Sequence, residues 1–136
     1  MDLLKVFVPT YIIGMAVDFL WLGVIAGGFY KTQLAGMIRA TKDFSGGHWL
    51  AAALVYVAIV GGIMLFVLPR STSVGSAALY GAIFGLVAYG IYELTNYSLL
   101  LNWPATVLMV DILWGIALCS VTSVLAYWFA SRGVIQ

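Results

Sequence analysis

Four long apolar runs dominate the chain, and short polar connections separate them. The runs cover residues 4–28, 49–68, 75–101 and 105–130. An α-helix needs about 20 apolar residues to cross the hydrocarbon core of a bilayer, so each run is long enough to cross once. Backbone groups in hydrocarbon must be hydrogen-bonded within the segment, which favours helices. The pattern predicts an all-α integral membrane protein, a four-transmembrane-helix bundle that forms one membrane domain over residues 1–136.

The connections show where the predicted helices end. Residues 69–73 (Pro-Arg-Ser-Thr-Ser) have the composition of a turn, and the short turn at residues 102–104 ends in a proline that suits the first turn of the next helix. The connection from Phe29 to His48 is longer. In helical phase its basic residues fall on one side and its apolar residues largely on the other. This predicts a short interfacial helix between the first two spans, with a solvated loop as the alternative.

Composition agrees with a lipid environment. Hydrophobic residues make up 64% of the chain and charged residues 8%, with a mean hydropathy of +1.09, whereas a soluble domain has about a quarter charged residues. The net charge of +1 gives no electrostatic basis for nucleic-acid binding. Cys119 is the only cysteine, which excludes a disulfide within the chain. The first run is interpreted as a retained helix and not as a signal peptide, because it is long and contains Asp18.

The basic residues do not fix the orientation in the membrane. Three of them lie on the side where the chain begins and three on the opposite side; the two sets are Lys5, Arg70 and Arg132, and Lys31, Arg39 and Lys42. The positive-inside rule therefore gives a tie. The amine of Met1 weakly favours a cytoplasmic position for the first side.

Three carboxylates lie inside the predicted helices: Asp18, Glu93 and Asp111. Such positions are unfavourable, since an Asp at the centre of a transmembrane helix costs about 2.5–3.5 kcal/mol. With the rise of an α-helix, they lie roughly 15, 12 and 10 Å from the same membrane face, the one at which the first helix ends. Because they share this depth on three helices, we expect them to converge on one site. We also expect at least one to hold a proton at neutral pH, because like charges repel.

Helical spacing adds aromatic and amide side chains to this site. Asp18 and Trp21 share a helix face because they are three residues apart, and Asp111 and Trp114 do the same. The third helix carries a polar stripe at helical spacing, and one tyrosine of the second helix lies at a similar depth. The predicted ligand- or ion-binding pocket comprises Asp18, Glu93, Asp111, Asn96, Tyr56, Tyr89, Tyr97, Trp21 and Trp114. The alternative is that these groups only hydrogen-bond between helices and hold the bundle together.

Two of the carboxylates lie in similar segments. Residues 17–21 (Val-Asp-Phe-Leu-Trp) match residues 110–114 (Val-Asp-Ile-Leu-Trp) at four of five positions. The two helices that contain them run in opposite directions, which is the relation that an inverted repeat leaves. A coincidental match between common membrane residues is the alternative.

The sequence contains no recognisable catalytic motif, which disfavours an enzyme, and it does not indicate whether a cofactor is bound. His48, near a membrane surface, does not predict a metal site. We expect a small membrane protein that binds or transports a cation, a proton or a polar or lipid ligand at the carboxylate cluster. The alternative is an accessory or structural subunit of a larger membrane complex. Four helices enclose little volume, which favours a homo-oligomer or such a complex.

Several motifs resemble those of a known family. They are Tyr92-Glu93-Leu94-Thr95-Asn96-Tyr97, Asn102-Trp103-Pro104 and Val110-Asp111-Ile112-Leu113-Trp114-Gly115, together with residues 18–21 and 29–30. Through them the chain resembles DUF2177, a family of bacterial membrane proteins of unknown function, over nearly its whole length. The resemblance implies a multi-pass protein of the bacterial inner (cytoplasmic) membrane, and it implies no established activity.

Overall fold

The computed structural model describes residues 3–132, and these are helical almost throughout. Their elements, in chain order, are α1 (Leu3–Leu20), the π-helical turn η1 (Trp21–Ile25), α2 (Gly27–Gln33), the 3₁₀ turn η2 (Thr41–Asp43), α3 (Gly46–Gly62), the π-helical turn η3 (Ile63–Val67), the 3₁₀ turn η4 (Leu68–Arg70), α4 (Val74–Leu99) and α5 (Ala105–Ser131). Within residues 3–132, four continuous helical segments are long and apolar enough to cross a membrane: Leu3–Ile25, Gly46–Arg70, Val74–Leu99 and Ala105–Ser131. The predicted all-α fold with four transmembrane helices is confirmed.

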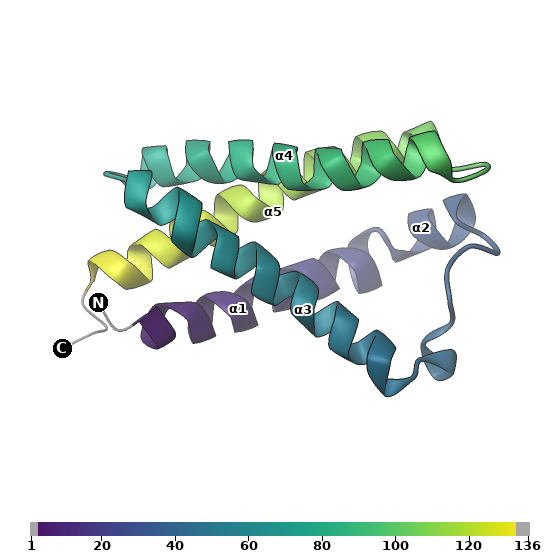
Figure 1. Ribbon diagram of the computed structural model, residues 1–136, viewed down its shortest axis with the longest axis horizontal. Helices are drawn as coiled ribbons and strands as arrows, with labels where there is room; N and C mark the ends of the chain where they lie inside the picture. Colours follow the sequence, from purple (N-terminus) through teal and green to yellow (C-terminus); the bar gives the residue numbers. More distant parts are fainter. Residues whose placement is uncertain (1–2, 133–136) are drawn as a thin grey trace.

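The spanning segments alternate in direction (Figure 1). α4 and α5 lie side by side along their length, and α1 packs against both α5 and α3. α3 crosses the bundle obliquely: the turn η3 that follows it packs on α4, whereas its N-terminal half diverges from α4. The start of α1 and the end of α5 lie at one end of the bundle. The opposite end contains α2 and the turn between α4 and α5, and we call it the α2 end.

α4 and α5 approach closely because small residues face each other. A Cβ atom at Gly85 would overlap the backbone carbonyl of Gly115, and one at Gly81 would overlap the side chain of Ser123. The ring of Tyr89 in turn lies where a Cβ of Gly115 would be. Small residues are the usual means by which membrane helices pack backbone to backbone. The two glycines four residues apart on α4 therefore serve packing within this chain.

The first spanning segment ends in a π-helical turn that redirects the chain. In this turn the N–H of Ala26 donates to the carbonyl of Trp21 (2.7 Å). α2 follows, and Tyr30 and Leu34 are buried against Val107 of α5. Single π-helical turns are frequent at functional sites. Here the turn allows α2 to pack back onto the bundle.

The rest of the long connection contains little helix. α2 ends at Gln33, and η2 is a single turn. The backbone N–H of Ser45 donates to Nδ1 of His48 (2.9 Å), and the two residues form a capping box at the start of α3. His48 thus accepts a hydrogen bond from the backbone N–H of Ser45, which has no partner within the helix. A position of α2 within the membrane interface stays a prediction.

Candidate functional site

Asp18 lies inside the bundle and is 6% exposed. Its two carboxyl oxygens accept hydrogen bonds from two other helices: Tyr56 Oη of α3 donates to Oδ2 (2.6 Å), and Trp114 Nε1 of α5 donates to Oδ1 (2.6 Å). A carboxyl group that accepts at both oxygens has the hydrogen-bond pattern of an ionised carboxylate. One buried acidic group therefore joins α1, α3 and α5.

Trp21 and Trp114 stack face to face between α1 and α5, with ring centroids 4.4 Å apart and an interplanar angle of 7°. Whereas Trp114 donates to Asp18, Trp21 Nε1 donates to the phenol oxygen of Tyr30 (3.2 Å). Tyr30 in turn donates to Oδ1 of Asp111. Each indole thus directs its N–H toward the aspartate of the other helix, directly in one case and through a phenol in the other.

This crossed arrangement joins the two similar sequence segments. The helices that carry them are antiparallel (Figure 1), and the Asp-x-x-Trp patterns at residues 18–21 and 111–114 take matching roles. Each aspartate accepts a hydrogen bond from a tyrosine of a third element. The correspondence applies to these segments, and an inverted repeat of whole helices stays a prediction.

Glu93 of α4 is fully buried. Its Oε2 accepts a hydrogen bond from Nε1 of Trp103, which lies in the turn between α4 and α5 (2.8 Å). Its Oε1 accepts no hydrogen bond from an N–H or O–H group of the described residues. The group with which Glu93 interacts on α5 is the carboxyl group of Asp111. Two carboxyl groups are therefore neighbours at the α2 end of the bundle.

Tyr30 and Trp103 belong to this network although the sequence analysis did not select them. Both lie just outside the predicted spans, so a search restricted to span interiors missed them. Each is an aromatic residue with a polar tip that needs a partner when buried, which is the signal that could have identified them beside a membrane carboxylate. Burial raises the pKa of the Tyr30 phenol, and the hydrogen bond to Asp111 raises it further. Tyr30 is therefore a neutral donor at physiological pH.

The remaining predicted site residues lie on α4. Tyr89 and Asn96 are partly buried, and Tyr97 is 52% exposed. Tyr97 follows Glu93 by about one helical turn and lies near the end of α4 at Leu99. The structure joins Asp18 to Tyr56 and Trp114 and stacks Trp21 on Trp114. It places Glu93 beside Asp111, apart from the Asp18 cavity, and leaves Tyr97 at the surface.

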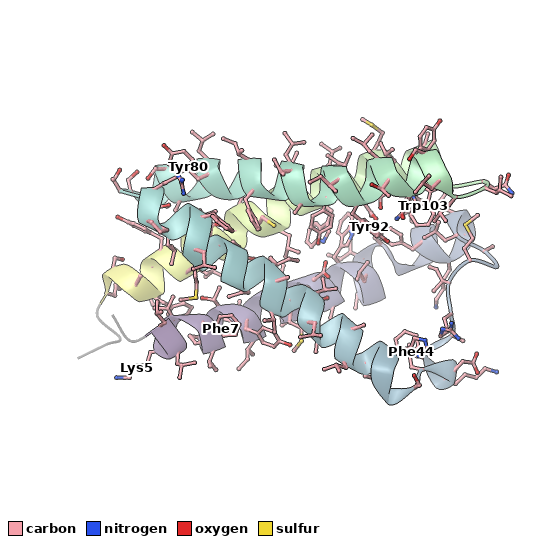
Figure 2. The ribbon with its side chains drawn as sticks, viewed as in Figure 1. Lys5, Phe7, Phe44, Tyr80, Tyr92 and Trp103 are labelled. Carbon is pink, nitrogen blue, oxygen red and sulfur yellow. The ribbon has the colours of Figure 1, made fainter. Side chains whose placement is uncertain are left out.

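A cavity of about 520 Å³ lies between α1, α3 and α4. Asp18 and Tyr56 are its buried residues, whereas Leu22, Val55 and Tyr92 form an exposed rim. In Figure 2 Tyr92 lies on the side of α4 that faces α1 and α2. The rest of the lining is aromatic or small and apolar: Ala52, Ala58, Ile59, Ala88 and Tyr89. Because the rim residues belong to spanning segments, the cavity opens sideways toward lipid.

The chemistry of this network is that of carboxyl groups with neutral N–H and O–H donors. Within residues 3–132, His, Cys, Asp and Glu side chains form no group of three that could hold a metal ion. The donors satisfy carboxyl oxygens without supplying positive charge. The arrangement is therefore suited to receive protons or a positively charged group.

One family of membrane proteins matches most of the chain. The family model DUF2177, described as a predicted membrane protein, matches residues 3–128. No curated protein matches the chain, and no solved structure does. The matched region contains the three carboxyl groups of the spanning helices and their aromatic partners. The chain therefore belongs to DUF2177, a family of predicted membrane proteins.

Proposed function

We propose that this protein binds a membrane amphiphile with a positively charged head, and that the head pairs with Asp18 in the cavity between α1, α3 and α4. The observation that carries the proposal is the position of Asp18. A carboxylate that is 6% exposed lines a cavity that opens toward lipid. A buried carboxylate without a counter-charge is strongly unfavourable. A cationic head group in the cavity would remove this penalty.

The basic residues of the chain are placed away from this carboxylate. All of them lie near the ends of spanning segments or in connections: Lys5, Lys31, Arg39, Lys42, His48, Arg70 and Arg132. Lys5, on the same helix as Asp18, is thirteen residues before it, which is roughly 20 Å along the helix axis. The hydrogen bonds that Asp18 accepts come from a phenol and an indole, which carry no charge. A ligand is therefore the natural source of positive charge.

The cavity lining matches both parts of such a ligand. Three phenol rings, those of Tyr56, Tyr89 and Tyr92, surround the space beside Asp18. A cation over an aromatic face gains about 0.5–2 kcal/mol. Leucine, valine, isoleucine and alanine side chains supply the surface for an alkyl chain. The cavity volume of about 520 Å³ lies within the range of small-molecule sites.

The sideways opening favours an amphiphile over a small hydrated ion. The exposed rim is formed by Leu22, Val55 and Tyr92, so a ligand that enters there comes from the bilayer. A hydrated ion would need a polar path from water, because its dehydration in lipid is very costly. We propose the bacterial inner membrane as the location, which the motifs shared with the family support. A cationic lipid or lipophilic amine of that membrane is the ligand class.

Binding of dodecylammonium and of dodecanol to the purified protein in neutral phosphatidylcholine nanodiscs tests this proposal. The two probes share an alkyl chain and differ in charge, and empty nanodiscs give the partition background. We expect dodecylammonium to bind more tightly than dodecanol. Asp18→Asn should weaken dodecylammonium binding about tenfold or more, because a hydrogen bond to a charged group contributes about 1.5–3 kcal/mol.

The matched control is Asp43→Asn. Asp43 lies in η2, is exposed and is not part of the cavity lining, so its replacement should leave the affinity unchanged. A second variant, Tyr56→Phe, keeps the charge of Asp18 and should weaken binding less than Asp18→Asn. Equal affinity of the wild type and Asp18→Asn for dodecylammonium would overturn the proposal, as would equal binding of the two probes to the wild type.

A further inference from the structure

We infer that Glu93 and Asp111 form a proton-binding site in which the two carboxyl groups share one proton. This site lies at the α2 end of the bundle, and neither residue lines the cavity that contains Asp18. The inference does not depend on a ligand in that cavity.

The hydrogen bonds around the pair leave Oε1 of Glu93 without a donor. Oε2 of Glu93 accepts from Trp103, and Oδ1 of Asp111 accepts from Tyr30. Oε1 of Glu93 is buried and receives no N–H or O–H group of the described residues, whereas the Asp111 carboxyl group is its neighbour. Two carboxyl groups can hydrogen-bond to each other only when one of them is protonated. A proton between them supplies the donor that Oε1 lacks.

Electrostatics leads to the same conclusion. Two carboxylates in contact inside a protein cannot both remain ionised, and a shared proton relieves their repulsion. The groups that face the pair are neutral: Tyr30 from α2, Trp103 from the turn before α5, and Tyr92 from α4. With one proton the pair carries a single negative charge. Two neutral donors, the Tyr30 phenol and the Trp103 indole, then stabilise that charge.

The proton site is connected to the cavity through aromatic residues. Tyr30, which donates to Asp111, accepts from Trp21. Trp21 stacks on Trp114, and Trp114 donates to Asp18. Loss of the shared proton would add a second negative charge beside Tyr30. Because Tyr30 accepts a hydrogen bond from Trp21, this charge would also change the electrostatic environment of the Trp21–Trp114 stack. The proton site and the cavity are thus physically linked while their carboxyl groups are separate.

Infrared spectroscopy tests the inference, because a protonated carboxyl group has a carbonyl stretch that an ionised carboxylate lacks. The detergent must be free of esters, whose carbonyl groups absorb in the same region. We expect this band at neutral pH in the wild type and in Asp18→Asn. It should be lost or move to another frequency in Glu93→Gln and in Asp111→Asn, because both variants lose the hydrogen bond between the two carboxyl groups. Absence of the band from the wild type would overturn the inference. A band at an unchanged frequency in either Glu93→Gln or Asp111→Asn would also overturn it.

Isotope labelling of the wild type keeps the test valid if a variant does not fold. Glu93 is the only glutamate in the chain, so carbon-13 glutamate reports on this residue alone. If the proton is shared, labelled glutamate and labelled aspartate, introduced in separate samples, should each shift part of the band. A band that shifts with only one of the two labels would place the proton on a single residue and would contradict sharing.

Discussion

Trp21 and Trp114 come from the first and last spanning segments, and their rings stack with centroids 4.4 Å apart. The stack places each indole N–H toward the helix that carries the other indole. Trp114 reaches Asp18 directly, whereas Trp21 reaches Asp111 through Tyr30. One aromatic contact therefore holds two separate carboxyl groups in position.

The two indoles should contribute unequally to stability. Trp114→Phe removes a donor to a carboxylate, and a hydrogen bond to a charged group contributes about 1.5–3 kcal/mol. Trp21→Phe removes a donor to a neutral phenol, which contributes about 1 kcal/mol. Both variants lose the same ring area, so the difference between them isolates the hydrogen bonds. Denaturant unfolding in one detergent measures both, and a larger loss in Trp21→Phe would contradict the assigned partners.

Gly85→Ala should destabilise the bundle strongly. The added methyl group would overlap the backbone of Gly115, so α4 and α5 would have to separate. Overpacking of this kind costs about 1–3 kcal/mol. Gly61→Ala is the matched control, because a Cβ at Gly61 would have no atom outside its own helix within 4 Å. That control should be neutral or stabilising by up to about 1 kcal/mol, since alanine favours helix. Equal melting temperatures of the two variants would refute the close approach.

The sequence predicts a common depth for the three carboxyl groups of the spanning helices. Apolar run length defines the spans, and the fixed helical rise then places Asp18, Glu93 and Asp111 in the same half of the membrane. Spacing of three residues also put each tryptophan beside its aspartate. These predictions use only properties of a regular helix, which explains why they need no tertiary structure.

The contacts of Tyr30 could not be predicted from a regular helix. In a regular α-helix, Tyr30 would lie about half a turn away from Trp21, on the opposite face. The π-helical turn at residues 21–25 and the redirected helix α2 bring the two side chains into hydrogen-bond contact instead. The tilt of α3, which opens the cavity, likewise results from packing between helices. Neither feature has a periodic signal in the sequence.

Filling the cavity should abolish dodecylammonium binding without loss of stability. Ala52 lines the cavity, whereas its neighbour Ala51 is exposed on another face of α3. Ala52→Leu should therefore occupy ligand space, and Ala51→Leu should add the same atoms at the outer surface. We expect at least tenfold weaker binding in the first variant and unchanged binding in the second. Similar affinities of the two variants in nanodiscs would contradict a ligand site at this cavity.

Alkaline pH should destabilise the protein partly through Tyr30. Burial and Asp111 raise the pKa of this phenol in the folded state, whereas in the unfolded chain it has the ordinary value of about 10. Above pH ~10 the unfolded state therefore binds fewer protons than the folded state, and stability falls as pH rises toward the folded pKa. One such group contributes up to about 1.4 kcal/mol per pH unit.

Tyr30→Phe removes this group and should make the decline shallower above pH ~10, although it lowers stability at neutral pH by removing the hydrogen bond to Asp111. The slope of the unfolding free energy against pH measures the effect. Below pH ~9 both proteins should have the same slope, because the phenol is neutral in both states there. Identical slopes of the wild type and the variant above pH ~10 would show that folding does not raise the pKa of Tyr30, and with it that the phenol is not buried against Asp111.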